Sequence, residues 1–345
     1  MVVSLSAFSF LLLAAQGLPT GGRITGSVTD AISGAPISGA RVTLTMVVDV
    51  PEGTFGRRPR QSITDANGVF AFDGVEAAQY ILNVEKTGFA SYPDVFGDGP
   101  PDRLTVDSGH EDVQLRIALK KGAVIAGRIV NAAGEPEANL QVSALKRTDK
   151  AGPLGFAQVG NAPTNDLGEF RIAGLPSGDY RIVAMGQHHG PFDAIQTGAT
   201  TLAPTFFPGT RDQNAATIMT LVPGQAVTGI EFSIATVAAF RVSGVVVDQS
   251  GRPSPSAMVT LIPNIRTSAF FMPAIVVAGD DGTFEIGQVV PGTYRIRANA
   301  NDAAAGGGIG AVSFDVASDG TPSGPDAITV GSADVTGLRV VASRR

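Results

Sequence analysis

Short runs of alternating apolar and polar residues follow one another along most of the chain. Ile24, Gly26 and Val28 alternate with polar neighbours, and Phe70 and Phe72 do the same further on. A period of two with one polar side is typical of half-buried antiparallel strands. Gly, Pro, Asp and Asn separate the runs, and no stretch keeps a helical period. The pattern therefore predicts an all-β protein built from short strands.

The same succession of blocks occurs three times. Its opening block lies at 23–30, 125–131 and 242–248, and its closing block at 112–117, 227–232 and 335–340. Between them a Phe is followed ten residues later by a Tyr, and this places three of the four tyrosines at Tyr80, Tyr180 and Tyr294. Long internal repeats indicate tandem structural units. We expect three domains, at 23–121, 122–239 and 240–345.

Each opening block carries a glycine at a position that the alternation turns inward: Gly26, Gly127 and Gly244. A glycine inside a strand indicates a bulge or the close approach of another backbone. We therefore expect structural roles for these three glycines and for the three repeated tyrosines.

These blocks resemble the carboxypeptidase regulatory-like domain. The shared signature reads roughly G-x-V-x-D-x-x-G-x-P, then T-D-x-x-G-x-F, then P-x-G-x-Y; it lies at 26–36 and 64–70, and at 176–180 and 291–294 in the later copies. The first copy has Glu76-Ala-Ala-Gln79 in place of the last motif, so its turn should differ. The resemblance implies three tandem seven-stranded prealbumin-like or Ig-like β-sandwich domains. The resemblance predicts the fold specifically but says little about the function.

The N-terminus predicts export. Leu5 to Ala15 is an apolar stretch broken only by Ser6 and Ser9, too short to span a bilayer. Ala15 and Gly17 fit a signal-peptidase site, so we expect residues 1–17 to be a signal peptide, with a buried first strand as the alternative. No later run suggests a transmembrane segment. The long second copy resembles versions found in envelope proteins of Gram-negative bacteria, which implies the periplasm, the outer membrane surface or the extracellular space.

The composition of the chain excludes several kinds of catalytic and binding site. The chain has no Cys, which excludes a disulfide scaffold and a Cys nucleophile. None of its three histidines (His110, His188 and His189) has Glu three residues later, as a carboxypeptidase-type zinc site requires. We expect no catalytic residue, no metal and no cofactor, and so no enzyme. A net charge of -6 with few lysines argues against nucleic acid as a partner.

Aromatic residues in the variable loops are the candidate binding residues, because sandwiches place function on such loops. They are Phe55, Tyr92, Phe96, Phe156, Phe206, Phe207, Phe270 and Phe271. Exposed aromatics could stack on sugar rings or anchor a partner. The alternative is that they cap the ends of the cores, and the absence of Trp weighs against strong sugar binding.

We therefore expect a non-catalytic exported cell-envelope or secreted protein, acting as an array of binding or spacer modules. Its partner would be a cell-surface protein or a polysaccharide. The alternative is an array of carbohydrate-binding modules with a starch-binding-like fold, using the loop aromatics.

Overall fold

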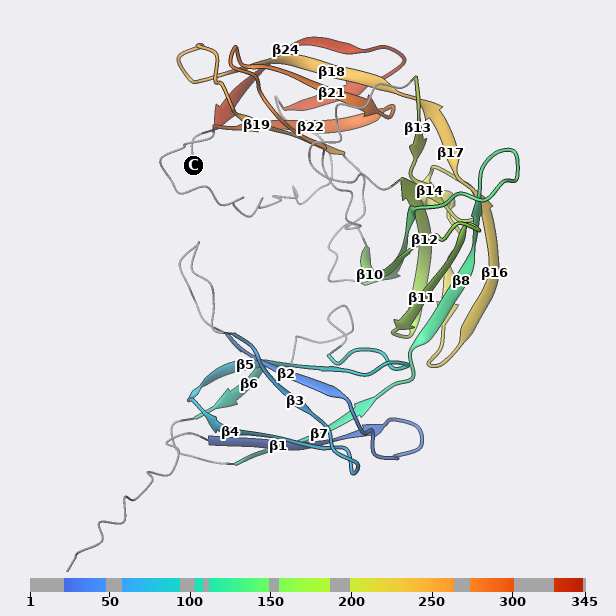
Figure 1. Ribbon diagram of the computed structural model, residues 1–345, viewed down its shortest axis with the longest axis vertical. Coiled ribbons are helices and arrows are strands. Elements are labelled where there is room, and N and C mark those ends of the chain that lie inside the picture. The colour runs from blue at the N-terminus through green and yellow to red at the C-terminus, as the bar shows by residue number, and fades with distance from the viewer. Residues whose placement is uncertain are drawn as a thin grey trace, which may run out of the picture. The chain divides into compact units, whose positions relative to one another are not determined.

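The structure, a computed structural model, describes residues 22–47, 58–93, 103–107, 112–148, 155–186, 199–263, 274–300 and 326–343 (Figure 1). Within these ranges the regular structure is β-strand, apart from one short 3₁₀ helix, η3 (Gln213–Ala215). No helix in the described part of the chain is long and apolar enough to cross a membrane. The all-β class that the alternation predicts is confirmed.

In the described residues, the first copy has seven strands in two sheets, ordered β4–β1–β7 and β3–β2–β5–β6. The strands are β1 (Gly22–Asp30), β2 (Arg41–Val47), β3 (Arg60–Ile63), β4 (Val69–Val75), β5 (Ala78–Glu85), β6 (Arg103–Val106) and β7 (Val113–Leu119). Every second residue of β1 is buried, from Gly22 to Asp30, as the period of two requires.

The second copy repeats this order and adds strands to it. Its sheets are β11–β8–β16 and β10–β9–β12, with β14 and β15 both pairing with β12. The repeated strands are β8 (Ala123–Val130), β9 (Leu140–Arg147), β10 (Phe156–Pro163), β11 (Glu169–Leu175), β12 (Gly178–Gly186), β15 (Met219–Leu221) and β16 (Ala226–Ser233). The added strands are β13 (Thr200–Ala203), β14 (Thr205–Phe206) and β17 (Ala235–Ala238), and β13 pairs with β17.

The part of the third copy that the structure describes again has seven strands. They are β18 (Phe240–Val247), β19 (Met258–Pro263), β20 (Ala274–Val277), β21 (Thr283–Val289), β22 (Gly292–Asn299), β23 (Ala327–Val330) and β24 (Val335–Ser343). The last strand pairs with β18 and, at Ala298↔Ala342, also with β22. The two layers are therefore joined along one side into a single sheet.

The chain forms two compact units. One comprises residues 1–84 and 101–118, and the other residues 85–100 and 119–345, so the second and third copies fall in one unit. The domain boundaries at 121/122 and 239/240 remain a prediction.

Each of these two copies has a core that draws on both of its layers. In the second copy, Ile125 and Phe170 from one sheet pack with Val142 and Tyr180 from the other. In the third copy, Val242 and Val259 belong to the corresponding core. Because the copies bury the same strand positions, the repeated sequence blocks are explained by packing.

The glycines of the opening strands lie against the backbone of the closing strands. A Cβ on Gly127 would lie 2.0 Å from the carbonyl oxygen of Ile230, and one on Gly244 would lie 2.1 Å from that of Leu338. A Cβ on Gly26 would lie 2.6 Å from Cζ of Phe70 and 2.8 Å from a backbone oxygen. Only glycine fits at such distances. This is the close backbone approach that the sequence predicts.

A bulge in the closing strand brings that carbonyl inward. The register between β16 and β8 shifts between Val227 and Ile230, and Gly229 in this interval has φ of +75°. The third copy repeats the arrangement at Gly337, which has φ of +73°. The backbone at both positions lies in the left-handed region, which glycine adopts without steric cost.

The repeated tyrosines close the turn that precedes their own strand. The hydroxyls of Tyr80, Tyr180 and Tyr294 donate to the backbone oxygens of Glu76, Pro176 and Val290, at 2.9, 2.5 and 2.7 Å. The first copy makes the same bond although its turn lacks Pro and Gly. All three rings are buried. Burial raises the pKa of the Tyr294 hydroxyl well above its ordinary value, and the charge of Arg211 opposes the shift.

Candidate binding surface

The candidate aromatic residues differ in their surroundings. Phe55, Phe96, Phe270 and Phe271 lie outside the described residues, as do the predicted signal peptide and the three histidines. Tyr92 and Phe207 are half-buried. Phe156 and Phe206 are buried, with exposed fractions of 6% and 3%.

The prediction that Phe156 and Phe206 offer an exposed stacking face is therefore wrong. They belong to a second apolar cluster of the second copy, separate from its core, which we call the outer-face cluster. Its members are Leu145, Phe156, Val183, Met185, Phe206 and Ala216. Leu145 and Val183 alternate with core residues along β9 and β12, so the cluster lies on the side of the sheet that faces away from the core.

The segment from Thr205 to Ala216 covers this side of the sheet. β14 pairs with β12, which places Phe206 opposite Val183. The following turn is held by η3, where the Asp212 carboxylate accepts from the backbone N–H of Asn214 at 2.9 Å. Phe207 points toward the core instead, in an edge-to-face contact with Phe232. Phe207 therefore packs against the core, as the capping alternative expects, whereas Phe156 and Phe206 are buried in a cluster apart from the core.

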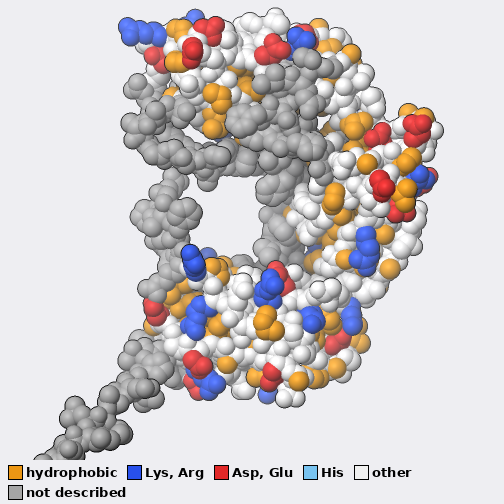
Figure 2. Space-filling model, viewed as in Figure 1, with side chains coloured by type: hydrophobic (Ala, Val, Ile, Leu, Met, Phe, Trp, Pro, Cys, Tyr) orange, Lys and Arg blue, Asp and Glu red, His pale blue; other side chains and the backbone are white. Residues whose placement is uncertain are grey.

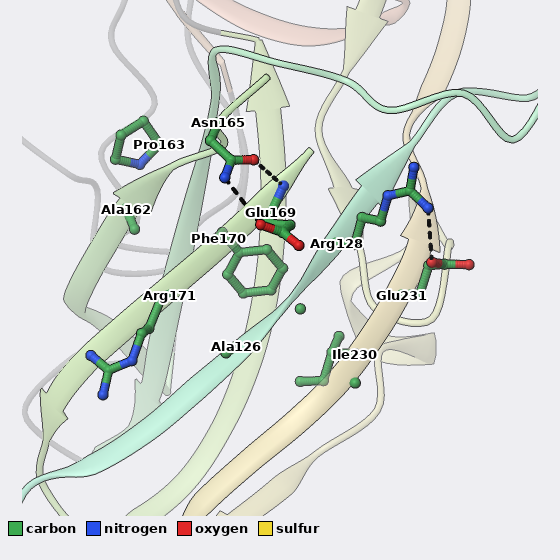
Figure 3. A pocket seen from close by; sticks show the side chains of 12 residues that line it. Ala126, Arg128, Ala162, Pro163, Asn165, Glu169, Phe170, Arg171, Ile230 and Glu231 are labelled. Atoms are coloured by element: carbon green, nitrogen blue, oxygen red, sulfur yellow. Dashed lines mark hydrogen bonds and ion pairs between the residues drawn. The ribbon is translucent and has the colours of Figure 1, made fainter. Parts of the chain in front are cut away.

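An open depression of about 680 Å³ lies on the other sheet of the second copy, which we call the groove (Figure 3). It follows the outside of β11–β8–β16 and is bordered by the end of β10. Its lining residues are Ala126, Gly127, Arg128, Ala162, Pro163, Asn165, Glu169, Phe170, Arg171, Gly229, Ile230 and Glu231. Small residues on β8 and the glycine of the bulge line the middle of the groove, and charged and amide side chains lie at its rim.

Hydrogen-bonding side chains surround the groove. Arg128 donates from Nε to the backbone oxygen of Leu167 at 3.0 Å and lies 3.9 Å from Glu231. Asn165 donates to Glu169 at 3.1 Å on the opposite side. Within the described residues the side chain of Arg171 makes no hydrogen bond or ion pair, and Figure 3 shows its guanidinium pointing away from the other charged groups. The groove can therefore offer both donors and acceptors to a polar ligand.

Sequence reasoning did not find the charged residues of the groove. Arg128 on β8, Glu169 and Arg171 on β11 and Glu231 on β16 occupy outward positions, where the alternation predicts ordinary solvated side chains. What brings them together is the parallel return of β16 onto β8, which joins residues about 100 positions apart. Alternation reports which side a residue faces and not which strands are neighbours.

Charges of both signs are interspersed on the face drawn in Figure 2. The exposed pairs include Arg23 with Asp73 at 2.9 Å and Arg241 with Glu285 at 3.6 Å. Such pairs contribute little to stability in water. In the described part of the chain, no group of three or more His, Cys, Asp or Glu side chains could hold a metal ion.

Comparison with known proteins supports the resemblance seen in the sequence. Residues 23–120 match the family described as carboxypeptidase regulatory-like domain. This match spans the first copy, and the resemblance expected there is confirmed. No curated protein matches the chain.

The solved structures to which the chain shows a weak similarity include two bacterial pilins and a protein of Bacillus anthracis. GBS52, the minor pilin of Streptococcus agalactiae, is 14% identical over 63% of this chain and 97% of its own, with a TM-score of 0.31. BcpA, the major pilin subunit of Bacillus cereus, is 13% identical over 93% and 98%, with a TM-score of 0.23. The Bacillus anthracis TIE protein is 11% identical over 94% of this chain and 51% of its own, with a TM-score of 0.24. Similarities this low say nothing about what the chain binds.

Proposed function

We propose that the chain, whose residues 23–120 are a carboxypeptidase regulatory-like domain, is a non-catalytic exported protein of the cell envelope or the extracellular space. Its three sandwiches would act as binding and spacing modules. The observation that carries this proposal is what the copies repeat. They share strand order, the glycine at the close approach and the tyrosine that closes a turn, all of which are parts of the frame.

The outward surfaces, in contrast, differ from copy to copy. The groove and the outer-face cluster belong to the second copy. Such a combination is typical of an array of modules. The common frame sets the spacing between modules, and the surface of an individual module binds a partner. A cell-surface protein or a polysaccharide would be the partner.

Export is tested by cell fractionation. The full chain, tagged at its C-terminus, is expressed in a Gram-negative host, and the mature N-terminus is determined by mass spectrometry. We expect the tag in the periplasm, the outer membrane or the medium, with cleavage after Gly17. A chain that stays in the cytoplasm and keeps residues 1–17 would contradict the proposal.

The non-catalytic assignment is tested by a broad hydrolase screen of the purified chain. We expect no turnover above the blank. Turnover that follows the protein through two unrelated purification steps would contradict the assignment.

Carbohydrate binding is the second candidate, and the groove is the observation that favours it. Its rim carries amide, carboxylate and guanidinium groups, which suit the hydroxyls of a sugar. The buried Phe156 and Phe206 no longer support the version that relies on exposed aromatics.

A polysaccharide pull-down separates the two candidates. Arg171→Ala should abolish retention if the groove binds sugar, while Arg241→Ala, an exposed arginine of the third copy, should leave it unchanged. If the polysaccharide retains both variants, the groove is not the sugar-binding site. If it does not retain the original chain either, carbohydrate binding is excluded as the function.

A further inference from the structure

We propose that Arg147 and Arg181 form a site for a single carboxylate group, supplied by an acidic side chain of a partner polypeptide. The site lies at the margin of the outer-face cluster of the second copy. It is on the opposite sheet from the groove and does not depend on the function proposed above.

Three neighbouring strands bring the site together. Phe156 on β10 is directly opposite Arg147 on β9, and Arg181 on β12 is directly opposite Leu145, two residues before Arg147. These side chains all face away from the core. The pairing of β10–β9–β12 therefore places two guanidinium groups beside one aromatic ring.

The ring holds both guanidinium groups in position. Cζ of Arg181 lies 4.1 Å from the centre of the Phe156 ring, and Cζ of Arg147 lies 5.6 Å from it. Arginine stacks on aromatic faces through cation–π attraction, and its planar fork then loses little freedom when it binds. Two cations are thus held near each other before any ligand arrives.

Arg181 lacks an acceptor of its own among the described residues. Its Nε is enclosed and has no hydrogen-bond partner. The nearby carboxylates are engaged elsewhere: Asp179 pairs with Arg147 at 3.4 Å and accepts from Thr220 at 2.7 Å, while Asp212 caps η3. An enclosed donor without an acceptor lowers stability, and no carboxylate of the described residues is bonded to the Arg181 guanidinium in compensation.

The electrostatics favour an added negative charge. The pKa of Arg181 is lowered by desolvation and then by the charge of Arg147, and Asp212 partly offsets both. A carboxylate placed between the two guanidinium groups would relieve their repulsion.

The chemistry of the site selects one carboxylate over a polyanion. A planar carboxylate matches the planar guanidinium fork and can be held by two parallel bonds. Asp179 and Asp212 border the site, and the chain has a net charge of -6, so a densely charged polymer would be repelled. A single acidic side chain of a protein partner meets both conditions.

The test follows the side-chain Nε–H signals of the ¹⁵N-labelled full chain by NMR. Glutamate blocked at both termini is the probe, and chloride at equal ionic strength is the control. We expect a saturable shift of the Arg181 signal with the glutamate probe and none with chloride. Arg181→Lys keeps the charge and removes the planar fork, so it should weaken binding about tenfold.

Arg295→Lys is the matched control variant, because Arg295 follows Tyr294 as Arg181 follows Tyr180. It should bind the probe like the original chain. If Arg181→Lys disturbs the protection of β12 against hydrogen exchange, Arg147→Lys takes its place with the same expected weakening.

Three results would overturn the proposal: no saturable shift at Arg181, equal shifts with chloride, or tighter binding of sulfate than of the carboxylate. Glucuronate, a sugar with one carboxylate, is a further arm of the experiment. Binding of glucuronate weaker than or equal to that of blocked glutamate supports the polypeptide source, and tighter binding overturns it.

Discussion

The second and third copies share one frame and differ on the outer side of one sheet. On that side of β12, Arg181 is followed by Val183 and Met185, both in the outer-face cluster. The corresponding residues of β22 are Arg297 and Asn299, which follow Arg295 and are half-buried. The core positions between them are apolar in both copies. Inward positions therefore define the fold, while outward positions can be changed without altering strand order.

The largest effect should come from the glycines at the close approach. Gly127→Ala and Gly244→Ala should each lower the free energy of unfolding by about 3 kcal/mol, because the new Cβ meets a backbone carbonyl that cannot move without breaking the ladder. Hydrogen exchange of β8 and β18 measures the loss in each copy. Gly331→Ala, with no neighbour within 4 Å of the added atom, is the control. If only one of the two substitutions lowers the stability of its copy, the two copies do not share a common frame.

Phe206→Ala should affect the second copy alone. Truncating a buried Phe leaves a cavity and lowers stability by about 3 kcal/mol. We expect faster exchange in β12 and β14 with no change in β22. Val277→Ala, at an exposed position of the third copy, should change stability by less than about 0.5 kcal/mol. An equally small change for Phe206→Ala would show that the outer-face cluster adds nothing.

The tyrosine hydroxyls should contribute a smaller, equal amount in both copies. Tyr180→Phe and Tyr294→Phe each remove a donor from a backbone oxygen, at a cost of about 1 kcal/mol. Urea titration followed by exchange in β12 and β22 measures both. Costs that differ severalfold would mean that the turns are not equivalent.

Alkaline pH should destabilise the third copy through Tyr294. Its pKa is higher in the folded state than the value of about 10 expected when unfolded, so the unfolded state loses its proton first. Ionisation of Tyr294 therefore leaves the free energy of unfolding unchanged below about pH 10. At higher pH it lowers this free energy, by about 1 kcal/mol for a rise of about one pH unit above that point. Urea midpoints at pH 8 and pH 11 test this. Tyr294→Phe should remove this part of the loss, and a loss that persists in the variant would rule out Tyr294 as its source.

Prediction from the sequence succeeded where residues report on their own strand. Alternation identified the strands, and the interval from Phe to Tyr identified corresponding positions in the copies. It also indicated the close approach at Gly127 and Gly244. Phe156 and Phe206 were misjudged as exposed, because they look like loop residues until β10 is seen to pair with β9 and β14 with β12. A sign was present in the unbroken apolar run from Ile182 to Met185, which is typical of a strand buried on both sides.

The amino-acid order alone was enough to establish the class of fold, the three copies and the glycines and tyrosines of the frame, since each depends on local periodicity and on repetition. Only the tertiary structure revealed the groove and the pair of arginines on Phe156. Both are made by neighbouring strands, and which strands become neighbours depends on the return of distant segments to the sheet. In the groove this is β16 beside β8, and at the arginines it is β12 beside β9. A period of two predicts which face of the sheet each residue occupies, but it does not predict which residue lies opposite on the neighbouring strand.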